Sequence, residues 1–277
     1  MISYGQRLVA ALRQRGPLCV GIDPHPGVLA SWDLPLNSNG LERCARGLVE
    51  ALGELVPVFK PQSAFFEAYG AAGVAVLERT LTDIAAMGAL SLLDVKRGDI
   101  GSTMAAYTAA YLCEGSPLAA DAITVNPYLG FGSLDGAIAL ARSQGRGVYV
   151  LALTSNPEGP EIQHATTADG RTVGQLIIDR AASCNTGPEL GSVGVVVGAT
   201  IKAPGVDFGR LNGSILAPGL GAQGATAGDL RRVFGSACEN VLPAMSREVM
   251  NAGPEPAALR TAARHALGEM EAAIAVR

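Results

Sequence analysis

The strongest constraint on the fold is an alternation of short, continuous apolar runs with longer amphipathic segments. Within a run, apolar residues follow one another instead of alternating with polar ones, which is typical of parallel strands buried on both faces. Between most runs, apolar residues recur at a spacing of three or four, as Leu41, Cys44 and Leu48 do, which predicts helices. The runs lie at 18–23, 56–62, 89–96, 121–128, 147–155, 193–200, 214–221 and 240–246.

This order of elements predicts an α/β fold with a parallel sheet. Eight strands in a chain of 277 residues fit a closed (β/α)8 TIM barrel, which fills about 250 residues as one domain. A doubly wound parallel sheet is the alternative with the same alternation. No shift in composition marks a linker, so we expect one domain over 1–277. Two connections, 24–40 and 156–170, are long enough to be lids or binding loops.

Composition excludes several classes of protein. Apolar residues make up 48% of the chain, which is too many for a disordered protein. Only 17% of residues are charged and the net charge is −4, so no basic field is available to bind nucleic acid. The longest uncharged stretch, 211–228, is interrupted by glycines and Pro218, and the N-terminus lacks the apolar core of a signal peptide. We expect a cytoplasmic protein that does not bind membranes.

Cysteine and histidine are too scattered to form a metal site. None of the five cysteines forms a Cys-x-x-Cys motif, and none lies near one of the three histidines at the spacing of zinc ligands. We therefore expect reduced thiols and no metal centre.

Polar residues end nearly every apolar run. In a barrel, reactive side chains gather at the C-terminal ends of the strands, so these residues would share one site. Taken singly, each of them could mark no more than the end of a strand. The residues are Asp23, Lys60, Asp94, Lys96, Asn126, Ser155, Thr200 and Arg247.

The densest group of charges is the segment 92–103, LLDVKRGDIGST. Asp94 and Lys96 are two residues apart on a strand, so both side chains leave the same face, whereas Arg97 leaves the other. Asp99 follows on the loop. Flanking carboxylates favour the charged form of Lys96, which suits proton donation better than imine formation. The alternative is a structural ion pair at the mouth of the barrel.

A glycine-rich segment, 217–225 (APGLGAQGA), follows the seventh run. Gly219, Gly221 and Gly224 match Gly-x-Gly-x-x-Gly, but the motif does not open a βαβ unit, which argues against dinucleotide binding. In a barrel, the loops after the seventh and eighth strands often bind phosphate through backbone N–H groups and a helix N-terminus. Arg247 would add a bidentate contact. A tight turn beside a surface arginine is the alternative.

Together these motifs resemble the orotidine 5′-phosphate decarboxylase family over residues 17–250, most closely its longer bacterial branch, often called type 2. The most specific match is the run from Asp94 to Thr103, which fits the family's Asp-x-Lys-x-x-Asp-Ile-x-x-Thr. The resemblance implies loss of CO2 from orotidine 5′-phosphate, without a cofactor or metal, to give uridine 5′-phosphate in pyrimidine biosynthesis.

The resemblance also implies roles for the polar residues at the reacting end of the substrate. Asp23 and Lys60 would hold ribose hydroxyls, and Lys60 would also pair with Asp94. Asp94 would face the departing carboxylate, and Lys96 would protonate the ring carbon. Only such preplaced positive charge could stabilise the ring carbanion without a cofactor.

For the remaining residues the resemblance implies a shared dimer site and a phosphate site. Asp99, Ile100 and Thr103 would enter the neighbouring subunit's site in a homodimer. On the phosphate side, Ser155 would bridge pyrimidine and phosphate-loop contacts, and Gln223 and Arg247 would bind phosphate. The chain departs from the family in a longer interval between Gln223 and Arg247 and in a serine, not glycine, before Arg247. Asn126 and Thr200 receive no role.

Two other functions fit part of the pattern. Magnesium-dependent sugar-phosphate decarboxylases and synthases share the barrel and the Asp-x-Lys-x-x-Asp run, but they carry an acidic group on the second strand, where this chain has Lys60. A non-catalytic barrel that binds nucleotide phosphate would keep Gln223 and Arg247 but would not need Lys96 between two acids.

Overall fold

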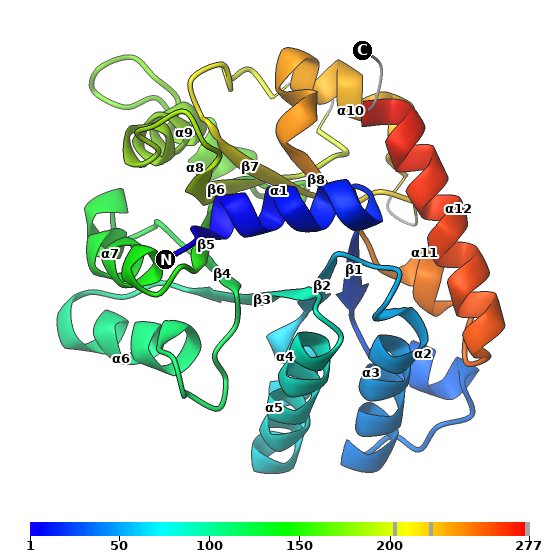
Figure 1. Ribbon diagram of the computed structural model, residues 1–277. Coiled ribbons are helices and arrows are strands. Elements are labelled where there is room, and N and C mark those ends of the chain that lie inside the picture. The colour runs from blue at the N-terminus through cyan, green and yellow to red at the C-terminus, as the bar shows by residue number, and fades with distance from the viewer. Residues whose placement is uncertain (202–203, 222–223, 275–277) are drawn as a thin grey trace.

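The computed structural model describes residues 1–201, 204–221 and 224–274. Its centre is a closed barrel of eight parallel strands in sequence order, with β1 hydrogen-bonded to both β2 and β8 (Figure 1). The predicted (β/α)8 barrel is therefore confirmed. The strands are β1 (Cys19–Ile22), β2 (Val58–Pro61), β3 (Leu90–Arg97), β4 (Ala122–Val125), β5 (Gly147–Leu153), β6 (Gly191–Val197), β7 (Gly213–Pro218) and β8 (Val241–Met245).

Helices surround the barrel and bury their apolar sides against the strands, as the spacing of apolar residues predicted. Leu41, Cys44 and Leu48, for example, are all fully buried on α3. The longer helices are α1 (Tyr4–Arg15), α3 (Ser38–Leu52), α5 (Gly70–Ala86), α6 (Gly101–Leu112), α7 (Asp135–Ser143), α9 (Val173–Cys184), α10 (Ala227–Phe234) and α12 (Pro256–Ile274). The shorter ones are α2 (Pro26–Ser31), α4 (Ser63–Glu67), η1 (Phe131–Leu134), α8 (Pro160–Gln163), η2 (Gly235–Asn240) and α11 (Arg247–Met250).

Helix α1 closes the N-terminal end of the barrel, across which it lies in Figure 1. Tyr4 and Leu8 are buried against side chains of the barrel interior, including Leu92. The Tyr4 hydroxyl lies 3.2 Å from the hydroxyl of Tyr149 on β5. Because this end is filled, a site in the barrel has to open at the C-terminal ends of the strands.

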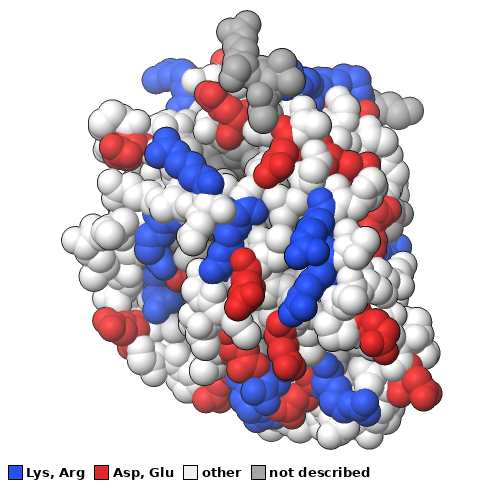
Figure 2. Space-filling view, turned by 45° about the vertical axis from the view of Figure 1, so that its right-hand side comes forward, with Lys and Arg blue, Asp and Glu red and all other residues white. Residues whose placement is uncertain are grey.

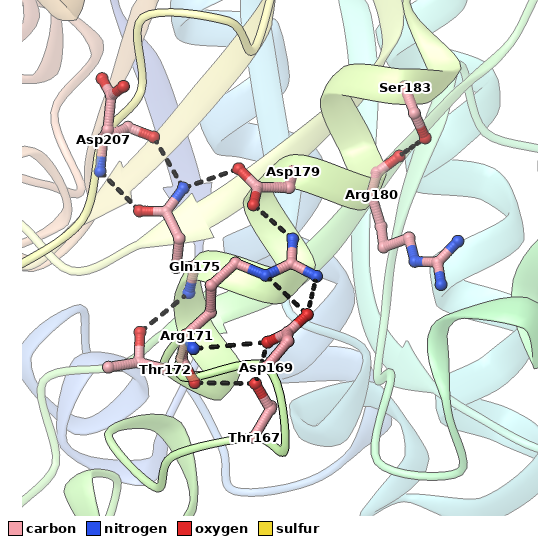
Figure 3. Close-up of polar contacts among 9 residues, drawn as sticks. All are labelled: Thr167, Asp169, Arg171, Thr172, Gln175, Asp179, Arg180, Ser183 and Asp207. Carbon is pink, nitrogen blue, oxygen red and sulfur yellow. Dashed lines mark hydrogen bonds and ion pairs between the residues drawn. The ribbon is translucent and has the colours of Figure 1, made fainter.

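The β6–β7 connection is the one that departs from the alternating pattern, because its described residues between 198 and 212 form no helix. A side chain of α9 fastens it instead: Gln175 accepts a hydrogen bond from the backbone N–H of Asp207 (2.7 Å) and donates one to its carbonyl (3.1 Å) (Figure 3). Gln175 also donates to Asp179 (2.8 Å).

The two long connections contain structure of their own. The segment 24–40 holds α2 and the first turn of α3, and the segment 156–170 holds α8. Beyond α8, Arg171 forms ion pairs with both Asp169 and Asp179 and so ties the loop to α9 (Figure 3). The expectation that 156–170 acts as a lid or a binding loop stays a prediction.

No helix within the described ranges is both long and apolar enough to cross a bilayer. Acidic and basic side chains are interspersed over the face in Figure 2, in keeping with the low net charge.

Candidate active site

Six of the eight polar residues at the strand ends line one cavity of about 260 Å³ at the C-terminal end of the barrel. An adjoining cavity of about 640 Å³ extends from it toward α4. The predicted residues that line the first cavity are Asp23, Lys60, Asp94, Lys96, Ser155 and Arg247. The expectation of one shared site at the strand ends is therefore met for these six.

Asp94, near the end of β3, is the most heavily engaged group in the site and is only 7% exposed. Its Oδ1 accepts hydrogen bonds from the Lys96 ammonium (2.6 Å) and the Thr124 hydroxyl (2.7 Å). Its Oδ2 accepts one from the Gln62 amide (2.8 Å) and lies 3.5 Å from Nζ of Lys60. A buried carboxylate is tolerated only when it is paired in this way, because desolvation disfavours the charged form.

These contacts keep both Asp94 and Lys60 ionised at neutral pH. Burial raises the pKa of Asp94, but Lys60 and Lys96 outweigh it and bring that pKa to about 2. Burial likewise lowers the pKa of Lys60, and the carboxylates of Asp23 and Asp94 raise it above its ordinary value. Lys60 thus lies between two carboxylates within one chain, at 3.8 Å and 3.5 Å.

Lys96 has an unusual backbone conformation, with φ at +45°, which residues other than glycine rarely adopt. The pairing of β3 with β4 shifts register between Leu93 and Arg97, and Lys96 lies in this irregular segment. Its side chain still meets Asp94, as predicted. Arg97 points away, as predicted, to an ion pair with Glu67 of α4 (2.6 Å).

Asp23, directly after β1, has one oxygen fixed and one oxygen available. Oδ2 accepts a hydrogen bond from the Ser246 hydroxyl (2.6 Å), which links the end of β8 to β1. Oδ1 is buried and has no hydrogen-bond partner among the described residues. The serine before Arg247 therefore has a structural purpose that a glycine could not serve.

On the opposite side of the mouth, the β7–α10 loop turns through glycines with positive φ, Gly221 at +68° and Gly224 at +95°. A side chain at Gly221 would begin 2.4 Å from Cγ of Glu248, so only glycine fits there. The N–H of Gly221 donates to Ala225 and that of Gly224 to Gly221, so the loop is held closed by its own hydrogen bonds. Arg247 begins α11, is exposed and lines both cavities, and Gln223 lies outside the described residues.

Asp99, Ile100 and Thr103 do not line the cavity of their own chain. Asp99 accepts a hydrogen bond from the N–H of Ile100 (2.8 Å). Its carboxylate oxygens do not come within 4.0 Å of the Lys96 ammonium, so the two residues form no ion pair within one chain. Ile100 is 61% exposed. Among the described residues, one chain therefore places a single carboxylate, that of Asp94, beside Lys96. That Asp99 supplies the second from a neighbouring subunit stays a prediction.

Two site residues, Gln62 and Thr124, were not singled out from the sequence, and Ser246 was noted only as the serine before Arg247 at the end of the eighth run. Each is a polar residue within or just after an apolar run, and that pattern was the available signal. Asn126 and Thr200 carry the same signal but do not line either cavity. Asn126 accepts a hydrogen bond from the N–H of Tyr128 (3.0 Å), which shapes the loop after β4.

The lowered pKa of Asp94 predicts that part of the free energy of unfolding is lost when the pH falls. The pKa is about 2 in the folded state and about 3.9 in an unfolded chain, so this stabilisation is full above about pH 5 and is lost as the pH falls toward 2. Between pH 6 and pH 3, the free energy of unfolding of the wild type should fall by about 1 kcal/mol more than that of Asp94→Asn. Urea denaturation at the two pH values measures this, and equal losses would contradict it.

Comparisons with known proteins agree with this geometry. Residues 16–262 match the family model described as orotidine 5′-phosphate decarboxylase / HUMPS family. The orotidine 5′-phosphate decarboxylase of Salinispora arenicola is 60% identical over 275 residues, covering 99% of each chain. That of Streptomyces coelicolor is 55% identical over 276 residues, also covering 99% of each.

Solved structures show the same likeness. A crystal structure from Streptomyces avermitilis is 56% identical and superimposes with a TM-score of 0.97, covering 100% of this chain and 97% of that one. The Leishmania donovani OMP decarboxylase is 28% identical, with a TM-score of 0.78 and full coverage of both chains. The chain therefore belongs to the orotidine 5′-phosphate decarboxylase / HUMPS family.

Proposed function

We propose that this protein decarboxylates orotidine 5′-phosphate to uridine 5′-phosphate without a cofactor, with Lys96 as the proton donor. The observation that carries the proposal is the Lys96 ammonium held 2.6 Å from the buried Asp94 carboxylate in the cavity at the barrel mouth. Relatives that are 55–60% identical over their full length and bear the name of this enzyme support the reaction.

The chemistry requires a fixed positive charge beside the ring. When the bond from the ring to the carboxylate breaks, CO2 leaves and the electron pair stays on the ring carbon. The Lys96 ammonium stabilises that charge and then transfers its proton to the carbon. Lys96 afterwards regains a proton from solvent. Asp94, whose charge is maintained by Lys60, would lie beside the substrate carboxylate and add repulsion that is relieved as CO2 departs.

The rest of the cavity suits a nucleotide. Oδ1 of Asp23 has no hydrogen-bond partner among the described residues and lies 3.8 Å from the ammonium of Lys60, so the two groups supply an acceptor and a donor for ribose hydroxyls. Across the mouth, Arg247 suits a phosphate, with Gln223 and Ser155 as further contacts. The N–H groups of Gly221 and Gly224 already donate within their own loop, so we do not assign them to the phosphate. Binding the phosphate away from the reacting carbon would supply energy for holding the carboxylate against Asp94.

A homodimer with shared sites would account for Asp99, Ile100 and Thr103. The β3–α6 and β4–η1 connections begin side by side, because the N–H of Asn126, directly after β4, donates to the carbonyl of Arg97, the last residue of β3 (2.7 Å). They expose three large apolar side chains, Ile100 (61%), Tyr128 (73%) and Leu129 (52%). A two-fold axis near this surface would bring each Asp99 to the partner's Lys96.

Magnesium-dependent sugar-phosphate chemistry is the second candidate from the sequence, and the donor set at Asp94 disfavours it. Both carboxylate oxygens already face ammonium groups and hydrogen-bond donors, which compete with a divalent cation. The first experiment is an assay of decarboxylation by the wild type with and without EDTA. We expect turnover in both. Absence of turnover, or turnover that EDTA abolishes and magnesium restores, would contradict the proposal.

Lys96→Ala should reduce kcat at least about 100-fold, because general acid catalysis contributes roughly 10²–10⁴-fold. Binding of uridine 5′-phosphate and the circular dichroism spectrum should stay close to those of the wild type. A variant that keeps more than about a tenth of the activity would show that Lys96 is not the proton donor.

Arg247→Ala should weaken binding of uridine 5′-phosphate about tenfold or more, since hydrogen bonds to a charged group contribute about 1.5–3 kcal/mol each. Uridine, which lacks the phosphate, is the matched control ligand and should bind both proteins equally. The same loss for uridine, measured by calorimetry, would show that Arg247 does not act on the phosphate.

The shared site predicts complementation between two inactive variants, Lys96→Ala and Asp99→Ala. In a mixed dimer one site carries both substitutions and the other carries neither, so mixing under subunit exchange should restore activity at one site per mixed dimer. Verified exchange without recovered activity would place Asp99 in the site of its own chain.

A further inference from the structure

We propose that Thr124 is a positioning residue that holds the Lys96 ammonium in place through a closed ring of hydrogen bonds. The proposal rests on the proposed function of Lys96 as proton donor. Thr124 lies on β4, next to β3 in the barrel, and is 1% exposed.

The ring starts and ends at Lys96, whose backbone N–H contacts Thr124 and whose ammonium contacts Asp94. The Thr124 hydroxyl accepts a hydrogen bond from the backbone N–H of Lys96 (2.9 Å) and donates one to Oδ1 of Asp94 (2.7 Å). The same Oδ1 accepts from the Lys96 ammonium (2.6 Å). A hydroxyl can donate and accept at once, whereas valine or alanine at this position could do neither.

The backbone of Lys96 explains why such a brace is needed. With φ at +45° and the β3–β4 register shifted between Leu93 and Arg97, the Lys96 N–H bonds a side chain of β4 instead of a strand carbonyl. Without the Thr124 hydroxyl, this N–H would lose its acceptor, and a regular extended backbone would become the favoured alternative. The ammonium would then leave its place beside Asp94.

Thr124 lines the cavity, but its role differs from that of a group that acts on the substrate. Its single hydroxyl proton is donated to Asp94, so while the ring is intact it has none to give to a ligand. Its removal should therefore affect the chemical step through Lys96 and leave nucleotide binding largely unchanged.

The experiment compares Thr124→Val, which keeps the shape and removes the hydroxyl, with Thr124→Ser, which keeps the hydroxyl. Thr80→Val is the matched control, because Thr80 is fully buried on α5 and its hydroxyl donates only to the carbonyl of Val76 (2.8 Å). We expect kcat to fall about tenfold or more in Thr124→Val, with the affinity for uridine 5′-phosphate changed less than about twofold. Thr124→Ser should recover most of kcat, and Thr80→Val should match the wild type.

The proposal is overturned if Thr124→Val keeps the kcat of Thr80→Val, or if it loses kcat and nucleotide affinity equally and serine restores neither. Should Thr124→Val fail to fold, hydrogen exchange of the Lys96 amide in the wild type decides. Slow exchange supports the ring, and exchange as fast as that of exposed loop amides overturns it. A wild type that does not decarboxylate orotidine 5′-phosphate would instead contradict the proposed function, and the amide measurement would still test the ring.

Discussion

The buried carboxylate of Asp94 is the constraint on which the rest of the site depends. It can remain charged inside the barrel only because two ammonium groups and two neutral donors surround it. Those partners come from β2, β3 and β4 or the residue just after β2, so the order of strands in the barrel is what brings them together. The same contacts give the two lysines different roles. Lys60 is buried and fixed between carboxylates, whereas Lys96 is partly exposed to the cavity and can meet a substrate.

Packing and hydrogen bonds around the barrel support this arrangement. Helix α1 fills the N-terminal end, so the polar groups are confined to the opposite mouth. Near that mouth, Gln175 hydrogen-bonds Asp207 and so links the described part of the β6–β7 connection to α9. Arg171 links the end of the β5–α9 connection to α9 through ion pairs with two carboxylates. Fixed loops around a polar cavity lower the reorganisation that a developing charge would otherwise require.

The strand positions and most of the site could be predicted from the sequence because both follow from local patterns. Continuous apolar runs marked all eight strands, and polar residues within or at the end of a run marked Lys60 and Asp23. The features that could not be predicted depend on pairing between segments that are distant in the sequence. The bond from Ser246 to Asp23 joins residues 223 positions apart, across the closure of the barrel. The left-handed conformation of Lys96 arises from a register shift against β4, which periodicity within β3 cannot reveal.

The central claim is that the group at position 96 must donate a proton and not merely carry a positive charge. Chemical rescue of Lys96→Ala tests this most directly, because the cavity would offer a small cation the space that the side chain leaves. Added methylammonium or ethylammonium should restore decarboxylation in proportion to its concentration. Tetramethylammonium, which has the same charge but no N–H, should restore none. Equal rescue by both kinds of cation, or no rescue by the primary ammonium ions, would contradict the account.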